Sequence, residues 1–404
     1  MKLSARWGTK QTQRRMDAQE LQRRAFVADA HADSLMWNRD LTVQSAEGQV
    51  DFPRLQEAGV KLQCFTIVTR GLPVIGAFPV FAAYRGWPAE ARSGEWARAS
   101  WQIDRMEDFC RRSGGKAAIA SRAANVEENL RLGCLSAVLG IEGAHALEGR
   151  VARVRELFAR GVRFMGLTHL GNNELGGSSF PSIARKGLTG LGRQVLEEMA
   201  HVGMSVDLAH ASPALVKEIL AHPKARPFCS HTGVRSVKGS WRNLDDASLR
   251  RIAERGGVVG IIFATVFLGG KEIGDVIRHI EHAVNVMGED AVGLGSDFDG
   301  MVPLPRGIRD VRDLHLLTAA LLQRYPERQV EKILGENLRR FFRETLPPCP
   351  FPPGQDCIYF RKRAGWLGCS PQTACNYGLA PAHPWHVDCF APVGLSTALF
   401  GGKQ

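Results

Sequence analysis

Short apolar runs alternate with helix-like segments along most of this chain, and this alternation limits the possible folds more than any other feature of the sequence. Eight of the runs have the length and the apolar content of buried strands. They cover residues 26–33, 60–68, 136–142, 162–169, 203–210, 227–231, 256–263 and 291–297. Because strands that alternate with helices usually pair in parallel, the pattern predicts an α/β fold built on one parallel sheet.

Helix-like segments lie between these runs and after the last of them. They cover residues 96–112, 150–160, 190–201, 213–221, 245–254, 274–287, 313–324 and 327–343. Eight strand–helix units are the number that closes a (β/α)₈ barrel of the TIM type, which is the fold we expect. A doubly wound open sheet is the alternative, but no GxGxxG motif follows an early strand, which argues against a dinucleotide-binding fold.

The composition changes at both ends of the barrel region. We expect a polar N-terminal arm with a short helix in residues 1–24, the barrel in residues 25–346, and an irregular extension rich in proline and cysteine in residues 347–404. Residues 69–95 form a long insertion that contains several aromatic residues and prolines. Connections of this length usually have a function, so we expect the insertion to cover a functional site or a subunit interface.

Overall composition favours a globular protein without a membrane span. The hydrophobic share is 44%, the charged share is 23%, and the formal net charge is +11. The basic residues are spread along the chain without a nucleic-acid-binding motif, so we expect no nucleic-acid partner, although anionic small molecules would be attracted. The first 25 residues contain no apolar leader, and Pro73 and Pro79 interrupt the longest apolar patch, residues 71–84. We therefore expect a cytoplasmic protein.

The chain contains nine cysteines. Cys64, Cys110, Cys134 and Cys229 lie in predicted strands or helices and are expected to be reduced thiols of the core. The other five lie in the C-terminal extension, together with two histidines. No CxxC pair occurs among them, which favours a loosely packed or disordered extension over a zinc site there.

Metal-competent or titratable side chains stand where six of the eight predicted strands end. They are His31 and Asp33 at the end of the first strand, then Glu142, His169, His210, His231 and Asp297. Alternate positions of a strand share a face, so His31 and Asp33 could contact one ion. Barrels carry their active sites at the carboxyl ends of the strands, so the sequence predicts a site where these seven side chains meet.

The ligand types predict two zinc-type ions. Neutral imidazole and carboxylate are the ligands that such ions prefer. His31, Asp33 and Glu142 would hold one ion, and His210, His231 and Glu142 would hold the other, with Glu142 as the bridge. Two divalent cations a few ångström apart lower the pKa of a bridging water and polarise an electrophile, and that chemistry is hydrolysis.

These and neighbouring segments resemble the membrane (renal-type) dipeptidase family, metallopeptidases with amidohydrolase-like barrels. The matching segments are residues 29–33, 140–143, 167–169, 206–210, 230–232, 241–244, 293–300 and 335–341. The resemblance covers roughly residues 25–345, and the order and spacing of the segments make it specific. It implies a barrel hydrolase with two Zn²⁺ ions, bridged by Glu142 and held by the ligands given above.

The resemblance also implies roles for residues that bind or act on the substrate. His169 would contact the scissile carbonyl oxygen and stabilise the oxyanion. Arg242 would pair with the terminal carboxylate of the substrate. Asp297 would bind substrate and move a proton from the attacking water to the leaving amine, whereas Asp299 would shape a turn. The remaining histidines are expected to be non-catalytic; they are His145, His201, His222, His279, His282 and His315.

The function expected from this resemblance is hydrolysis of the peptide bond of dipeptides, including L,D-dipeptides, and a homodimer is left open. Two alternatives remain. One is a related barrel hydrolase recruited to a biosynthetic pathway. The other is a non-catalytic scaffold protein that uses its basic surface and its cysteine-rich extension. The intact set of metal-competent side chains argues against the scaffold.

Overall fold

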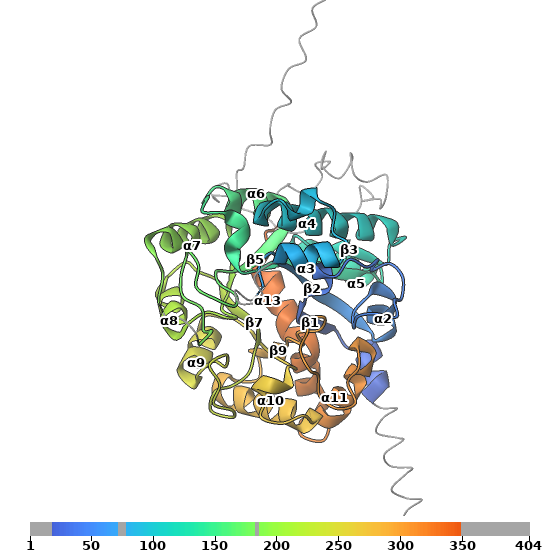
Figure 1. Ribbon diagram of the computed structural model, residues 1–404. Coiled ribbons are helices and arrows are strands. Elements are labelled where there is room, and N and C mark those ends of the chain that lie inside the picture. The colour runs from blue at the N-terminus through green and yellow to red at the C-terminus, as the bar shows by residue number, and fades with distance from the viewer. Residues whose placement is uncertain (1–17, 72–77, 182–185, 349–404) are drawn as a thin grey trace, which may run out of the picture. The chain divides into compact units, whose positions relative to one another are not determined.

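A closed ring of parallel strands surrounded by helices forms the centre of the protein (Figure 1). The computed structural model describes residues 18–71, 78–181 and 186–348. The ring contains β1 Val27–Ala32, β2 Val60–Val68, β4 Leu135–Glu142, β5 Val162–Gly166, β6 Ser205–Asp207, β7 Pro227–Thr232, β8 Val259–Ile261 and β9 Val292–Leu294. Each strand pairs in parallel with the next, and pairing of β2 with β4 closes the ring. The predicted (β/α)₈ barrel is confirmed.

One short strand lies outside the ring and was not predicted. β3, Ala117–Ile119, pairs in parallel with the first residues of β4. It has only three residues and lies in a short alanine-rich run, whereas the equally short strands β6, β8 and β9 lie within the longer runs at 203–210, 256–263 and 291–297.

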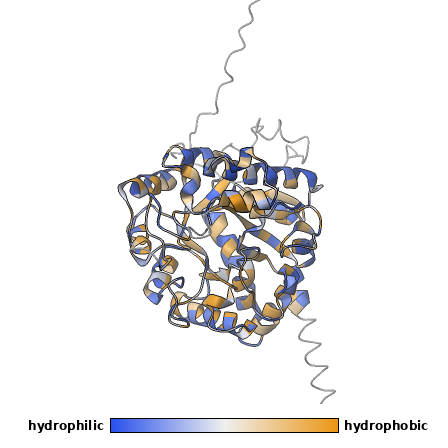
Figure 2. Cartoon of the chain, in the orientation of Figure 1, coloured by the Kyte–Doolittle hydropathy of each residue, from blue (hydrophilic) through white to orange (hydrophobic). Residues whose placement is uncertain are grey.

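The helices lie outside the ring of strands. They are α2 Phe52–Glu57, α3 Phe78–Tyr84, α4 Glu95–Arg112, α5 Ala123–Arg131, α6 Arg153–Ala159, α7 Gly190–Val202, α8 Pro213–Ala221, α9 Asp246–Glu254, α10 Ile273–Met287, α11 Leu314–Leu321, α12 Glu327–Glu331 and α13 Asn337–Thr345. Figure 2 shows mixed hydrophilic and hydrophobic residues along most of them, as expected for helices with one face on a core. The helix predicted over residues 327–343 is α12, a π-helical turn at Lys332–Glu336, and α13. Of the helices described, α2, α3 and α5 were not predicted.

Helix α13 covers one end of the barrel. Phe341 stacks on Phe228, with ring centroids 5.1 Å apart, and Phe228 also meets the ring of Phe164 edge-on. Phe26, which directly precedes β1, belongs to the same buried cluster. These contacts lie near the amino ends of the strands, so the opposite end of the barrel is the one available for a site.

The insertion at residues 69–95 is partly helical, which differs from the loop that we expected. It contains α3 and a 3₁₀ turn at Glu90–Arg92, while its residues 72–77 lie outside the described residues. Aromatic contacts hold it on the barrel: Phe81 meets the ring of Trp37 edge-on, and Trp87 packs 4.2 Å from Trp101. Helix α3 was missed because its seven residues are all apolar or aromatic, so no polar positions reveal a helical period.

The two ends of the chain lie mostly outside the described residues. Of the N-terminal arm, residues 18–24 are described and are helical. Of the extension at 347–404, only residues 347 and 348 are described, so its cysteines remain a matter of prediction. The four remaining cysteines are free thiols. Among the described helices, none is both long and apolar enough to cross a lipid bilayer.

Candidate metal centre

The side chains predicted at the strand ends converge at the carboxyl end of the barrel. His31 and His231 lie within β1 and β7, and Glu142 is the last residue of β4. Asp33 directly follows β1. His169, His210 and Asp297 each lie three residues beyond the end of a strand, which is β5, β6 and β9 respectively. All seven side chains are buried. Because parallel strands end at the same edge of the sheet, segments distant in sequence deliver these groups to one place.

Three ligand atoms form a compact triangle. Glu142 Oε1 lies 2.9 Å from His210 Nε2 and 3.3 Å from His231 Nε2, and the two imidazole nitrogens are 3.1 Å apart. Ligand atoms arranged tetrahedrally at about 2.1 Å from a zinc ion are separated by about 3.4 Å. The triangle therefore has dimensions that suit one divalent ion.

A second group of ligand atoms surrounds His31. Its Nε2 lies 3.3 Å from Asp33 Oδ1, 3.7 Å from Glu142 Oε1 and 3.9 Å from Asp297 Oδ1. The hydroxyl of Thr66 donates to the same oxygen of Asp33 at 2.6 Å, which orients that carboxylate. Glu142 Oε1 thus contacts both groups, as a bridging ligand would.

Two of the groups with mutually close ligand atoms differ from the sets that we assigned from the sequence. One consists of His31, Asp33 and Asp297, and the other of Glu142, His169 and His210. His169 Nε2 lies 3.5 Å from Glu142 Oε2, so His169 borders the centre. Asp297 and His169, to which we gave roles on the substrate, are therefore close enough to touch a bound ion as well.

The charges in the cluster favour a cation. Burial raises the pKa of Glu142, but His169, His31 and His210 outweigh it and hold that pKa well below its usual range. Burial lowers the pKa of His31, yet Glu142 and Asp33 raise it to about 10. The carboxylates thus attract positive charge strongly. A divalent cation meets the same demand, so the residues present fit a metal centre.

Burial favours the neutral form of the His210 and His231 imidazoles, which is the form that binds metal ions. Burial lowers the pKa of both rings well below the usual value, and the nearby cation of Arg242 lowers it further. A neutral imidazole keeps one nitrogen lone pair free for a metal. His210 Nδ1 has no hydrogen-bond partner within the described residues.

Two site residues adopt left-handed backbone conformations. His210 has φ +62° and Asp297 has φ +63°. This region is unfavourable for residues with a Cβ and costs about 1–2 kcal/mol each. The turns redirect both side chains after their strands have ended, and such strain is typical of functional sites.

A glycine after Glu142 allows the neighbouring segment to approach. Gly143 has φ +78°, and a Cβ there would lie 2.9 Å from the Cβ of His169. His169 in turn contacts the carbonyl oxygen of Arg70 through Nδ1 at 3.0 Å. The start of the insertion at 69–95 therefore touches the candidate site through the backbone of Arg70.

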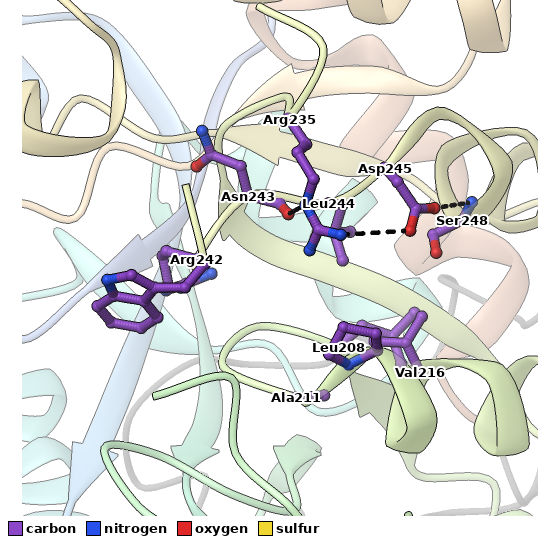
Figure 3. Close-up of a pocket in the computed structure, with 11 residues that line it drawn as sticks. Leu208, Ala211, Val216, Arg235, Arg242, Asn243, Leu244, Asp245 and Ser248 are labelled. Carbon is purple, nitrogen blue, oxygen red and sulfur yellow. Dashed lines mark hydrogen bonds and ion pairs between the residues drawn. The ribbon is translucent and has the colours of Figure 1, made fainter. Parts of the chain in front are cut away.

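Arg242 supplies a buried positive charge beside the cluster. Its Nη2 donates to the carbonyl oxygen of His231 at 2.9 Å, and its Nε has no hydrogen-bond partner in the part of the chain that the structure describes. No carboxylate of the described residues pairs with it. Figure 3 shows Arg242 at a pocket that Leu208 and Ala211, on either side of His210, also line. A buried guanidinium that pairs with no carboxylate of the described residues is suited to bind the carboxylate of a substrate.

Sequence reasoning missed a buried polar network behind the ligands. The hydroxyl of Ser230 contacts Asp207 and the rings of His231 and His31. Asp29 accepts hydrogen bonds from Ser296 and Gln63. Asp207 and Ser230 lie in two segments of the family resemblance, 206–210 and 230–232, but no role followed from their positions alone. Their spacing from the histidines was the available signal.

Buried imidazoles and carboxylates at the strand ends of a closed (β/α)₈ barrel are typical of metal-dependent hydrolases. The sequence profile of the membrane dipeptidase family (peptidase family M19) matches residues 15–346. The chain therefore belongs to the membrane dipeptidase family, a family of metallopeptidases.

Individual relatives agree with this assignment. Over 258 residues the chain is 31% identical to dipeptidase 3 of Mus musculus, a match that covers 60% of this chain and 50% of that protein. The chain thus spans about half the length of this curated relative.

Two solved structures are similar in fold. One is the metallopeptidase dipeptidase AC of family M19, with a TM-score of 0.68 and 26% identity over 80% of this chain and 99% of that one. The other is a metallopeptidase of Rhodobacter sphaeroides with a bound phosphinate mimic of L-Ala-D-Ala, with a TM-score of 0.68 and 25% identity over 80% of this chain and 99% of that one.

Proposed function

We propose that this protein is a dinuclear zinc dipeptidase that hydrolyses the peptide bond of dipeptides. The observation that carries the proposal is the position of Glu142 Oε1, which lies within 3.7 Å of imidazole nitrogens in both ligand groups. His31 and Asp33 would hold one ion, His210 and His231 would hold the other, and Glu142 would bridge the two. Zinc is proposed because imidazole and carboxylate are its usual ligands in hydrolases.

The residues around the centre have the chemistry that hydrolysis needs. A pair of bound divalent ions supplies an activated water and polarises the scissile carbonyl. Asp297 would accept the proton of that water and deliver it to the leaving amine. Burial raises the pKa of Asp297; His31 lowers it, but Asp33 and Glu142 raise it further, so that it lies well above the usual value. A carboxyl group with a raised pKa is suited to both accept and release a proton.

His169 and Arg242 would orient the substrate. Nδ1 of His169 donates to the carbonyl oxygen of Arg70 at 3.0 Å, which fixes the ring so that Nε2 would face the scissile carbonyl oxygen. Arg242 would pair with the terminal carboxylate. A site that recognises both charged ends of its substrate favours dipeptides. A longer peptide would have to bury part of its chain there and leave a charged group without its partner.

Metal removal and replacement test this function directly. We expect a chelator to abolish dipeptide hydrolysis and added Zn²⁺ to restore it, with two ions bound per chain as measured by elemental analysis. The substrate panel should contain L-Ala-L-Ala and L-Ala-D-Ala, since one relative binds a mimic of the latter. Normal metal content without turnover of any dipeptide would favour the recruited hydrolase, and less than one bound ion would favour the scaffold. A homodimer and a cytoplasmic location remain predictions.

Substitution of Arg242 by lysine tests carboxylate recognition. Lysine keeps the charge but loses the planar two-donor group, so we expect KM for a dipeptide to rise by about tenfold to 100-fold, with a smaller change in kcat. A dipeptide with an amidated C-terminus provides the comparison. Wild-type protein should prefer the free acid strongly, and the variant should lose most of that preference. An undiminished preference in the variant would contradict the role of Arg242.

A further inference from the structure

One buried hydroxyl, that of Ser230, lies behind the metal centre among three titratable side chains. Its Oγ is 2.5 Å from Asp207 Oδ2, 2.8 Å from His231 Nδ1 and 3.2 Å from His31 Nδ1. Ligand atoms of these three residues lie within 4.8 Å of one another, which resembles a metal site. Because the chain's own hydroxyl lies among them, this group is a hydrogen-bonded network rather than a third ion site.

The number of available hydrogens determines which atom donates. Asp207 Oδ1 accepts the backbone N–H groups of Ala209 at 3.0 Å and Ser230 at 2.9 Å, so this carboxylate is bound as an acceptor. Its other oxygen then takes the single hydroxyl hydrogen of Ser230. A serine hydroxyl has one hydrogen and two lone pairs, so both lone pairs are left to accept. The two imidazoles that contact them must therefore each carry a hydrogen on Nδ1.

Nε2 is then the nitrogen of each ring that is left for an ion, because a bound cation takes the place of any proton on it. The Nε2 atoms of His31 and His231 lie 3.7 and 3.3 Å from Glu142 Oε1, on the metal-facing side of the rings. In the proposed function these two rings belong to different ions. The same hydroxyl therefore contacts one ligand of each ion.

We propose that Ser230, held by Asp207, is a positioning residue that fixes the tautomer and orientation of one imidazole in each of the two metal sites. The inference rests on the proposed function and deepens it. Partners of this kind, on the far side of a ligand ring, typically change metal affinity tenfold to about 100-fold when removed. A shared partner differs from two separate ones because its loss weakens both sites together.

The chain contains a matched control. The hydroxyl of Ser296 donates to a second buried carboxylate, Asp29, at 2.6 Å. Its other contacts are with backbone atoms, the carbonyl oxygen of His31 at 3.1 Å and the N–H of Phe298 at 3.1 Å, and not with an imidazole ring. Ser296→Ala therefore removes a serine–aspartate hydrogen bond with similar burial but leaves both imidazoles supported.

The test compares the full chain with Ser230→Ala, Ser230→Thr and Ser296→Ala. Dissociation constants for Zn²⁺ and for Co²⁺ are measured by chelator competition, and the visible spectrum of bound Co²⁺ reports the ligand geometry. We expect Ser230→Ala to weaken both sites by about tenfold to 100-fold and to alter the Co²⁺ spectrum. Ser230→Thr, which keeps the hydroxyl, should restore most of the affinity, and Ser296→Ala should bind both ions as the wild type does.

Three outcomes would overturn the inference. Wild-type affinity at both sites in Ser230→Ala would show that the hydroxyl does not support the ligands. Weakening of one site alone would contradict the shared role while leaving the dinuclear centre intact. Equal weakening in Ser296→Ala would indicate a general loss of packing. Wild-type protein that binds neither ion would instead contradict the proposed function, and with it the role of Ser230.

Discussion

Replacement of Glu142 by glutamine is expected to remove both metal ions and to reduce dipeptide hydrolysis by about 1,000-fold or more, because both ligand groups depend on one carboxylate. Its Oε1 lies 2.9 Å from His210 Nε2 and 3.7 Å from His31 Nε2. Glutamine has nearly the same shape but no negative charge, and its amide hydrogens can occupy the imidazole lone pairs. Elemental analysis and a dipeptide assay on the same preparation measure both effects.

An exposed glutamate provides the control for this substitution. Glu254 lies on α9, is 59% exposed and pairs with Arg251. Glu254→Gln should leave metal content and turnover unchanged, since an exposed ion pair contributes about 0–1 kcal/mol to stability. If Glu142→Gln retains two ions per chain, Glu142 is not the bridge and the assignment of the centre is wrong.

Replacement of Asp297 by asparagine is expected to have the second-largest effect, with metal and fold retained. Asparagine cannot accept and release a proton, so kcat should fall by about 100-fold to 10,000-fold. The carboxylate of Asp297 lies 3.9 Å from His31 Nε2, at the border of the ligand group around His31, and the other ligands of that group remain. Elemental analysis of the variant should therefore still show two ions. A variant with full turnover would remove Asp297 from the mechanism.

Asp299 is the matched comparison, two residues along the same segment. Its carboxylate accepts from Arg39, from Ser34 Oγ at 2.5 Å and from the backbone N–H of Gln49 at 2.7 Å. We expect Asp299→Asn to lower the free energy of unfolding by about 3 kcal/mol, since it leaves a buried guanidinium without its partner. The turnover of the folded fraction should be nearly unchanged. Urea unfolding measures the stability of each variant, and kinetics of the folded fraction measure its turnover. Loss of turnover in Asp299→Asn together with loss of stability in Asp297→Asn would exchange the two roles.

The fold could be predicted from local patterns because element type depends on nearby residues. Apolar runs such as β2 and amphipathic segments such as α8 each carry their own period in the sequence. Their regular alternation restricts the connections to parallel strand–helix units. The short elements β3 and α2 were missed because neither lies within a longer patterned run, unlike the three-residue strands β6, β8 and β9.

The candidate site could be predicted as a set of residues but not as an arrangement. The strand-end positions of His31, Glu142 and His231 placed them at one end of the barrel. His210 and Asp297 reach the centre only through left-handed turns three residues beyond their strands. No spacing in the sequence specifies such a turn for a residue with a Cβ.

The sequence by itself determined the barrel, the family and the identity of the groups that converge. Only the tertiary structure decided which atoms approach one another, that Arg242 has no carboxylate partner among the described residues, and that Ser230 contacts two rings at once. The physical reason is that periodicity and composition are properties of neighbouring residues. Distances between side chains on different strands depend instead on closure of the ring, where β2 pairs with β4.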